Sequence, residues 1–272
     1  MNFRPRQNRI LEALKEGRIP LGMEVYTSNP SLIEIIGYAG FDFYKLDMEH
    51  TRINPETMEH CIRAADAVGI TTLVKVPDLN PITIMHAIEA GAQAISVPHI
   101  KNKEDARKAV NAVRYPPEGN LGSCSSIRSA CYSTKGWDHY LQHHSKQTML
   151  MAVLEDKEAI DNVEEIFAEL KPGVDAVSFG RGDLAQSLAK PGEEVDWDHP
   201  FVMEAYEKVL EVSKKTGIPV NAVPWPEATN ENVKAAIDKG ARICLYTIDQ
   251  LLFYEACQNI VKDMEGILNG GK

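Results

Sequence analysis

The sequence predicts an α/β protein that folds as a single (β/α)8 barrel, a TIM barrel. Short apolar runs suited to buried parallel strands alternate with amphipathic segments along the whole chain. The length of 272 residues also suits one barrel of this type. We therefore expect residues 1–272 to form one domain, with an N-terminal helix over residues 4–17.

Eight apolar runs supply the expected strands. They cover residues 19–26, 41–47, 71–76, 94–98, 149–154, 174–179, 218–223 and 241–246. Because a closed barrel of this type needs eight strands and the linkers are short, no second core is expected.

The segments between the strands carry helix start and stop signals. Asn-Pro pairs at 29–30, 54–55 and 80–81 each open a helical pattern. Asparagine caps the helix, and proline at the first helical position gives up an amide that has no intrahelical partner. Glycines at 69 and 91 supply left-handed stops.

Two insertions break this alternation. One is a loop region over residues 116–146, after the fourth helix, and the other covers residues 190–200, after Asp183. Long excursions of this kind often contribute to lids or subunit contacts. We expect them to border the functional site or another subunit.

Composition excludes several classes of partner. The net charge of −10 argues against nucleic acid and anionic membranes, both of which need clustered lysine and arginine. The chain has neither an apolar run of about 18 residues nor a signal-peptide pattern, so a cytoplasmic location is expected. Five cysteines without a CxxC pair are expected to be reduced thiols.

Ionisable residues follow the expected strands at their carboxyl ends. The set is Asp47, Glu49 and His50 after the second strand, Lys75 at the end of the third, His99 after the fourth, Glu155 and Asp156 after the fifth, and Arg181 and Asp183, which flank Gly182, after the sixth. In a closed barrel these ends surround one mouth. The sequence therefore predicts a functional site there.

Glu155 and Asp183 follow adjacent strands. Two carboxylates that face each other repel unless one is protonated or a divalent cation neutralises both. Oxygen ligands favour a hard ion, Mg²⁺ or Mn²⁺, with Co²⁺ as a third candidate. The alternative is that both residues only cap the helices that follow them, and spacing alone does not decide.

The other groups at the mouth allow more than one interpretation. His50 is either an acid/base or a solvated loop histidine. Lys75 is a cation of the barrel, a clamp for a substrate carboxylate or a Schiff-base nucleophile. His99 is more often structural at such a position.

Several motifs occur in an order that resembles the HpcH/HpaI aldolase family of metal-dependent pyruvate aldolases. The similarity runs from about residue 22 to residue 246. The motifs are AGFDFYKLDMEH (39–50), LVKVPDLNP (73–81), AGAQAISVPHI (90–100), VRYPPEGNLG (113–122), VLEDKEAIDNVEEI (153–166) and FGRGDLAQSLA (179–189). Members of this family include 4-hydroxy-2-oxoheptanedioate aldolase and 2-keto-3-deoxy sugar acid aldolases.

The resemblance implies a metal and oxo-acid site. Glu155 and Asp183 look like the two protein ligands of the divalent metal. The amides of Gly182 and Asp183 fall where the family binds the pyruvate carboxylate, at a helix N-terminus.

The resemblance also implies the catalytic groups. His50 looks like the family's base, and Glu89 aligns with the acidic residue that orients that histidine. Asp47 resembles the acidic residue near the aldehyde. A homo-oligomer, typically a hexamer in this family, is implied as well.

The chain departs from the family pattern at several positions. Lys75 stands in place of an arginine that clamps pyruvate, Val153 in place of a glutamine, and Glu24 where an aromatic residue is common. Residues 119–122 read GNLG where the family has GxRG. Arg181 replaces a proline, and we hypothesise that it partly substitutes for the missing clamp.

The expected function is that of a class II aldolase, which cleaves a 4-hydroxy-2-oxo acid into pyruvate and an aldehyde. A Schiff-base aldolase using Lys75 ranks lower because it leaves Glu155 and Asp183 unexplained. Two further alternatives stay open. One is a Claisen-type condensation at the same site, by which some relatives make citrate, and the other is a non-catalytic barrel that binds a small 2-oxo acid.

Overall fold

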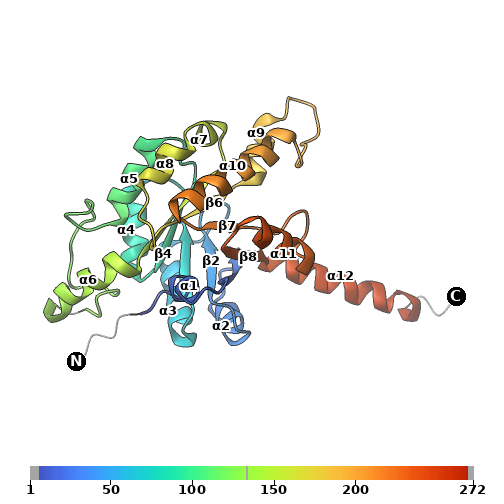
Figure 1. Cartoon of the computed structure of the whole chain (residues 1–272). Helices are drawn as coiled ribbons and strands as arrows, with labels where there is room; N and C mark the ends of the chain where they lie inside the picture. The colour runs from blue at the N-terminus through green and yellow to red at the C-terminus, as the bar shows by residue number, and fades with distance from the viewer. Residues whose placement is uncertain (1–5, 133, 269–272) are drawn as a thin grey trace.

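Eight parallel strands close into a barrel in the computed structural model, which describes residues 6–132 and 134–268 (Figure 1). The strands are β1 Leu21–Val25, β2 Phe43–Asp47, β3 Thr71–Lys75, β4 Ala94–Val97, β5 Met149–Leu154, β6 Ala176–Phe179, β7 Val220–Ala222 and β8 Ile243–Ile248. They follow one another in chain order around the barrel, and β8 pairs with β1. The predicted α/β class and (β/α)8 barrel are confirmed.

Helices surround this barrel. They are α1 Arg9–Lys15, α2 Pro30–Tyr38, α3 Pro55–Val68, α4 Pro81–Ala90, α5 Lys103–Val113, α6 Trp137–Gln147, α7 Lys157–Asp161, α8 Val163–Glu169, α9 Arg181–Leu188, α10 Pro200–Thr216, α11 Asn230–Lys239 and α12 Asp249–Leu268. The helical segments after β5 and β6 each consist of two helices. A short 3-10 helix, Thr134–Gly136, and α6 occupy the end of the insertion expected over 116–146, so that region is partly helical.

The expected capping signals operate as the sequence indicated. The side chains of Asn29, Asn54 and Asn80 each accept a hydrogen bond from an amide of the first helical turn. Gly69 and Gly91 end their helices with φ of 77° and 112°, a backbone conformation that glycine adopts without strain. The alternation of helix and strand is therefore encoded locally.

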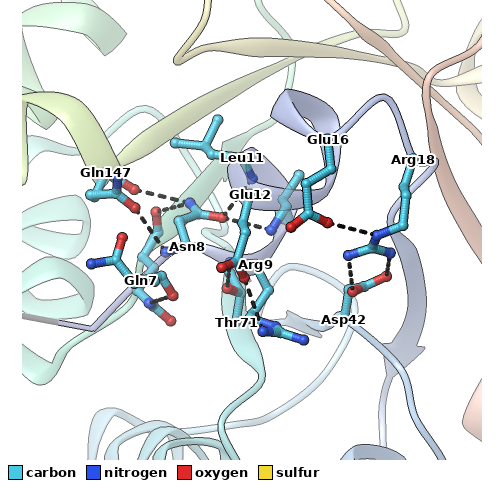
Figure 2. A network of polar contacts seen from close by, with 12 residues as sticks. Gln7, Asn8, Arg9, Leu11, Glu12, Glu16, Arg18, Asp42, Thr71 and Gln147 are labelled. Carbon is cyan, nitrogen blue, oxygen red and sulfur yellow. Dashed lines mark hydrogen bonds and ion pairs between the residues drawn. The ribbon is translucent and has the colours of Figure 1, made fainter.

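Helix α1 lies across the N-terminal end of the barrel, held by the polar network that Figure 2 shows. The Asn8 side chain accepts hydrogen bonds from the amides of the first turn and donates to the carbonyls of Gln93 and Gln147 at 3.0 and 2.9 Å. This cap starts the helix at Arg9, so it is shorter than the expected 4–17. Residues 4 and 5 lie outside the described part of the chain.

The barrel interior is apolar beneath α1. Its buried side chains are Ile10, Phe43, Leu73, Ala94, Met149, Met151, Ala176, Ile243 and Leu245. A larger core lies between the outer faces of the strands and the helices. Ile10 packs on the inner layer with no exposed surface, so α1 closes this end of the barrel.

A cavity lies at this same end of the barrel. Its volume is about 1300 Å³, and residues of α1, α10 and α11 line it, with Leu11, Leu14 and Leu210 among its apolar members. It is remote from the carboxyl ends of the strands, where the sequence predicts the site.

No helix in the described part of the chain is long and apolar enough to span a membrane. All five cysteines are free thiols.

Candidate active site

Asp47 organises the turn at the end of β2. Its Oδ1 accepts a hydrogen bond from the His50 amide at 2.6 Å, and its carbonyl accepts one from the Thr51 hydroxyl. The residue is fully buried, and its Oδ2 has no hydrogen-bond partner among the described residues. A buried carboxylate oxygen without a partner is costly, so it marks a place for a ligand or an ion.

Lys75, at the end of β3, is surrounded by acidic groups. Its Nζ contacts Glu49 Oε2, lies 4.0 Å from Asp47 Oδ2 and lies 3.4 Å from His50 Nε2. Burial lowers the pKa of the lysine ammonium, but attraction to Glu49, Glu155 and Asp47 outweighs burial, so the net pKa is raised. Lys75 is therefore held as a cation, whereas a Schiff base requires the neutral amine.

Glu155 follows β5 and is buried, with 3% of its surface exposed. Its Oε1 accepts a hydrogen bond from the His99 amide at 3.0 Å. The carboxylate packs against Gly180, which directly follows the neighbouring strand β6. A Cβ added at Gly180 would lie 2.8 Å from Glu155 Oε2. Gly180 thus leaves the space that this carboxylate occupies.

Asp183 lies in the first turn of α9, on the surface. Burial raises the pKa of the Glu155 carboxyl, repulsion by Asp183 raises it further, and Lys75 and His99 only partly offset this. Asp183 is therefore close enough to act on Glu155 through its charge. That these two carboxylates hold one cation between them stays a prediction.

His99 contributes more to the mouth than the sequence suggested. Its backbone is in the left-handed region, with φ of 53°, and its Nδ1 lies 2.9 Å from Asp156 Oδ2. Its Nε2 lies 3.7 Å from Glu49 Oε1. Burial lowers the pKa of His99, but the carboxylates of Asp156, Glu155 and Glu49 outweigh it and raise the net pKa.

Two groups of side chains in the described residues have ligand atoms within 4.8 Å of one another, close enough to hold a metal ion. One is Asp47, Glu49 and His50, and the other is Glu49, His99 and Glu155. Glu49 belongs to both, yet the sequence interpretation gave it no role. Its position two residues after Asp47 and next to His50 is the feature of the sequence that could have identified Glu49 as a site residue.

His50 lies at the surface of the mouth, with its Nε2 3.2 Å from Glu49 Oε2. Glu89 is in α4, where its charge acts on Tyr115 and Tyr140. No described hydrogen bond or ion pair joins Glu89 to His50. The orienting role of Glu89 stays a prediction.

Arg181, the first residue of α9, turns toward residues 189–199. Its Nη1 lies 3.3 Å from both the Trp197 carbonyl oxygen and Asp198 Oδ1. Its guanidinium also lies 5.1 Å from the centre of the Trp225 ring. Its predicted role as a clamp on the substrate stays a prediction.

A second buried ion pair lies next to the mouth. Glu24 of β1 and Lys45 of β2 are register partners, with 2.6 Å between Lys45 Nζ and Glu24 Oε1. Burial raises the pKa of the Tyr26 hydroxyl, and the charges of Glu24, Asp47 and other carboxylates raise it further. Glu24 was noted in the sequence as a departure, but its pairing with Lys45 was not foreseen.

The residues at the mouth fit a divalent cation. Asp47, Glu49, Glu155 and Asp183 bring four carboxylates together, and Lys75 is the buried cation among them. Carboxylate oxygens suit Mg²⁺ and Mn²⁺, and the imidazoles of His50 and His99 suit Mn²⁺ and Co²⁺ as well. The orphaned Oδ2 of Asp47 is consistent with such a site.

The HpcH/HpaI aldolase/citrate lyase family matches residues 21–256 of the chain. A 2-dehydro-3,6-dideoxy-6-sulfogluconate aldolase of Pseudomonas putida is 30% identical over 253 residues, which cover 93% of this chain and 95% of the relative. The family thus accounts for nearly all of the barrel.

Solved structures agree with this match. An HpcH/HpaI aldolase/citrate lyase family protein of Burkholderia cenocepacia J2315 has a TM-score of 0.85 and 27% identity, covering 95% of this chain and 100% of that one. The crystal structure of citrate synthase SbnG has a TM-score of 0.82 and 26% identity, covering 96% and 98%. The chain therefore belongs to the HpcH/HpaI aldolase/citrate lyase family.

Proposed function

We propose that this protein is a divalent-metal-dependent aldolase that cleaves a 4-hydroxy-2-oxo acid into pyruvate and an aldehyde. The observation that carries the proposal is the buried Glu155, whose carboxylate lies within 4.8 Å of potential metal-ligand atoms of Glu49 and His99. The charge of Asp183 acts on the same carboxyl. Membership of a family of aldolases and lyases supports the same reaction class.

Glu155 and Asp183 would hold the cation, which we propose is Mg²⁺ or Mn²⁺, with Co²⁺ as a third candidate. When bound, such an ion stabilises negative charge that develops on the keto oxygen of a 2-oxo acid. The His99 amide donates a hydrogen bond to Glu155 Oε1, and one ligand atom each of Glu49, His99 and Glu155 lie within 4.8 Å of one another.

The substrate carboxylate would bind at the start of α9. The amides of Gly182 and Asp183 are in the first turn of this helix, where backbone N–H groups have no intrahelical partner. Lys75 adds a fixed positive charge nearby, since its ammonium is retained by Glu49 and Asp47. A clamp is thus a better role for Lys75 than a nucleophile.

His50 would accept the proton of the C4 hydroxyl. As that proton leaves, the C4–O bond becomes the aldehyde carbonyl, the C3–C4 bond breaks, and its electron pair forms the enolate of pyruvate. Protonation of C3 then completes pyruvate. His50 is half exposed, with 48% of its side chain accessible, so it can exchange its proton with water.

The proposal is tested by metal removal. With 4-hydroxy-2-oxoheptanedioate as the probe substrate, treatment with a chelator should abolish pyruvate formation, and added Mg²⁺ or Mn²⁺ should restore it. Borohydride should trap no substrate on the protein, because Lys75 stays charged. Activity that survives complete chelation, together with trapping, would refute the metal route.

A condensation that makes citrate is the second candidate, supported by the likeness to citrate synthase SbnG. Turnover of acetyl-CoA with oxaloacetate, without aldol cleavage, would establish it in place of the aldolase. A barrel that merely binds a 2-oxo acid would show neither activity. It would also fail to exchange the C3 protons of pyruvate in deuterated water.

We also propose that the chain forms a homo-oligomer, with α12 packed against a second copy. This helix projects from the barrel (Figure 1) and touches mainly β1 and β8. Its large apolar side chains are exposed: Phe253 by 73%, Ile260 by 63% and Val261 by 67%. Their spacing puts them on one face, and an apolar stripe of this kind needs a partner.

A charge on that face should dissociate the oligomer. Phe253→Asp combined with Ile260→Asp should lower the molar mass measured by light scattering to that of one chain. Lys262→Glu, on the opposite face of α12, should leave the mass of the wild type unchanged. A wild type that is already monomeric at micromolar concentration would contradict this proposal.

A further inference from the structure

Residues 189–199, here called the strap, join α9 to α10 and fold back over the start of α9. The Trp197 ring lies 3.9 Å from the place where a Cβ on Gly182 would stand. The Trp197 carbonyl also accepts a hydrogen bond from Arg181 at 3.3 Å. The strap therefore lies against the residues that begin α9.

One polar atom joins the strap to two other segments. Asp198 Oδ1 accepts a hydrogen bond from Arg181 Nη1 at 3.3 Å and another from Trp225 Nε1 at 2.9 Å. Trp225 belongs to the loop after β7, and its ring faces both the Arg181 guanidinium, at 5.1 Å, and the Trp197 ring, at 5.9 Å. The start of α9, the strap and the β7 loop are thus cross-linked.

This cluster lies outside the barrel core. Trp197 keeps 42% of its surface exposed, and the Asp198 side chain keeps 70%. Surface contacts of this kind contribute little to the stability of a barrel whose core lies elsewhere. The cluster does, however, contact Arg181, which directly precedes Gly182.

We propose that Arg181 and Trp197 are positioning residues that hold the strap against the start of α9 and so fix the amides of Gly182 and Asp183 for a 2-oxo acid carboxylate. The inference rests on the proposed function, which places that carboxylate at these amides. Fixing donors before binding removes the entropy cost of ordering them when the ligand arrives. Arg181 then acts on the ligand through the backbone and does not touch it.

The test uses pyruvate as the probe, in the presence of saturating Mg²⁺. The variants are Arg181→Lys, Trp197→Ala and Trp225→Phe, the last of which removes the donor to Asp198 and keeps a smaller aromatic ring. Arg107→Lys is the matched control, because Arg107 of α5 makes its ion pair with Glu169 of α8, and no described hydrogen bond or ion pair joins it to the strap or to α9. Pyruvate Kd, the KM and kcat of cleavage, Mn²⁺ Kd and amide exchange over residues 180–188 are measured.

Arg181→Lys and Trp197→Ala should raise the Kd for pyruvate and the KM about tenfold. The kcat and the Mn²⁺ Kd should stay within about twofold of the wild type, and amides over 180–188 should exchange faster. Trp225→Phe should show a smaller change of the same kind, and Arg107→Lys none.

Wild-type values of pyruvate Kd and amide exchange in Arg181→Lys and Trp197→Ala would overturn the inference. Equal loss of kcat and Mn²⁺ binding would overturn it as well, because the variants would then disturb the whole mouth. Failure of the proposed function is distinct from both outcomes, since the wild type itself would then neither bind pyruvate nor cleave the probe substrate.

Discussion

Replacing Glu155 by glutamine should abolish metal-dependent turnover. The substitution keeps the size of the side chain, and a glutamine oxygen can still accept the hydrogen bond from the His99 amide. It removes the negative charge of the side chain. Because Glu155 is only 3% exposed, little water can reach this position to compensate for that loss. A metal's stabilisation of developing charge is worth several kcal/mol, which corresponds to a loss of about 10³-fold or more in kcat.

The measurement pairs steady-state cleavage with Mn²⁺ binding by titration calorimetry. Asp183→Asn should behave like Glu155→Gln in both assays. Glu56→Gln serves as the control, since Glu56 has an 86% exposed side chain on α3 and belongs to neither group of side chains that could hold an ion. If Glu155→Gln bound Mn²⁺ as tightly as the wild type, Glu155 would not be a ligand.

His50→Ala should reduce kcat by about 10² to 10⁴-fold, the range typical of losing a general base. Mn²⁺ affinity should be largely unchanged, because Glu155 and Asp183 are intact. The imidazole Nε2 of His50 lies 3.2 Å from Glu49 Oε2. The two readouts separate a base from a ligand: a base changes the rate and leaves the ion in place.

His60→Ala is the matched control for this variant. His60 is an exposed histidine of α3 that lies 4.0 Å from Glu56, so its loss should alter neither rate nor metal binding. A His50→Ala enzyme with wild-type kcat would show that another group takes the proton. His99, with its Nε2 3.7 Å from Glu49, would then be the next histidine to replace.

The fold could be predicted because its signals are local. Asparagine caps, proline at the first helical position and left-handed glycines determine where helices start and stop, and these positions agree with the structure. Strand ends shifted by one or two residues, because apolar side chains continue beyond the last paired residue. The run expected over 218–223, for example, pairs only over Val220–Ala222.

The candidate site was harder to predict beyond its location. The order of strands in a barrel brings their carboxyl ends together, so Asp47, Lys75 and Glu155 could be placed at one mouth from the sequence. Which pairs form depends on register and on side-chain conformation, neither of which local patterns reveal. The Glu24–Lys45 pair needs residues on two strands to face each other at 2.6 Å, and it was missed for that reason.

Helix α1, which closes the N-terminal end of the barrel, limits the side from which a ligand can approach. Ile10 packs on the inner apolar layer and the Asn8 side chain donates hydrogen bonds to the carbonyls of Gln93 and Gln147, so among the described residues this end of the barrel is closed by α1. A ligand of the candidate site must therefore approach and leave on the face formed by the carboxyl ends of the strands, where Glu49, His99 and Glu155 lie.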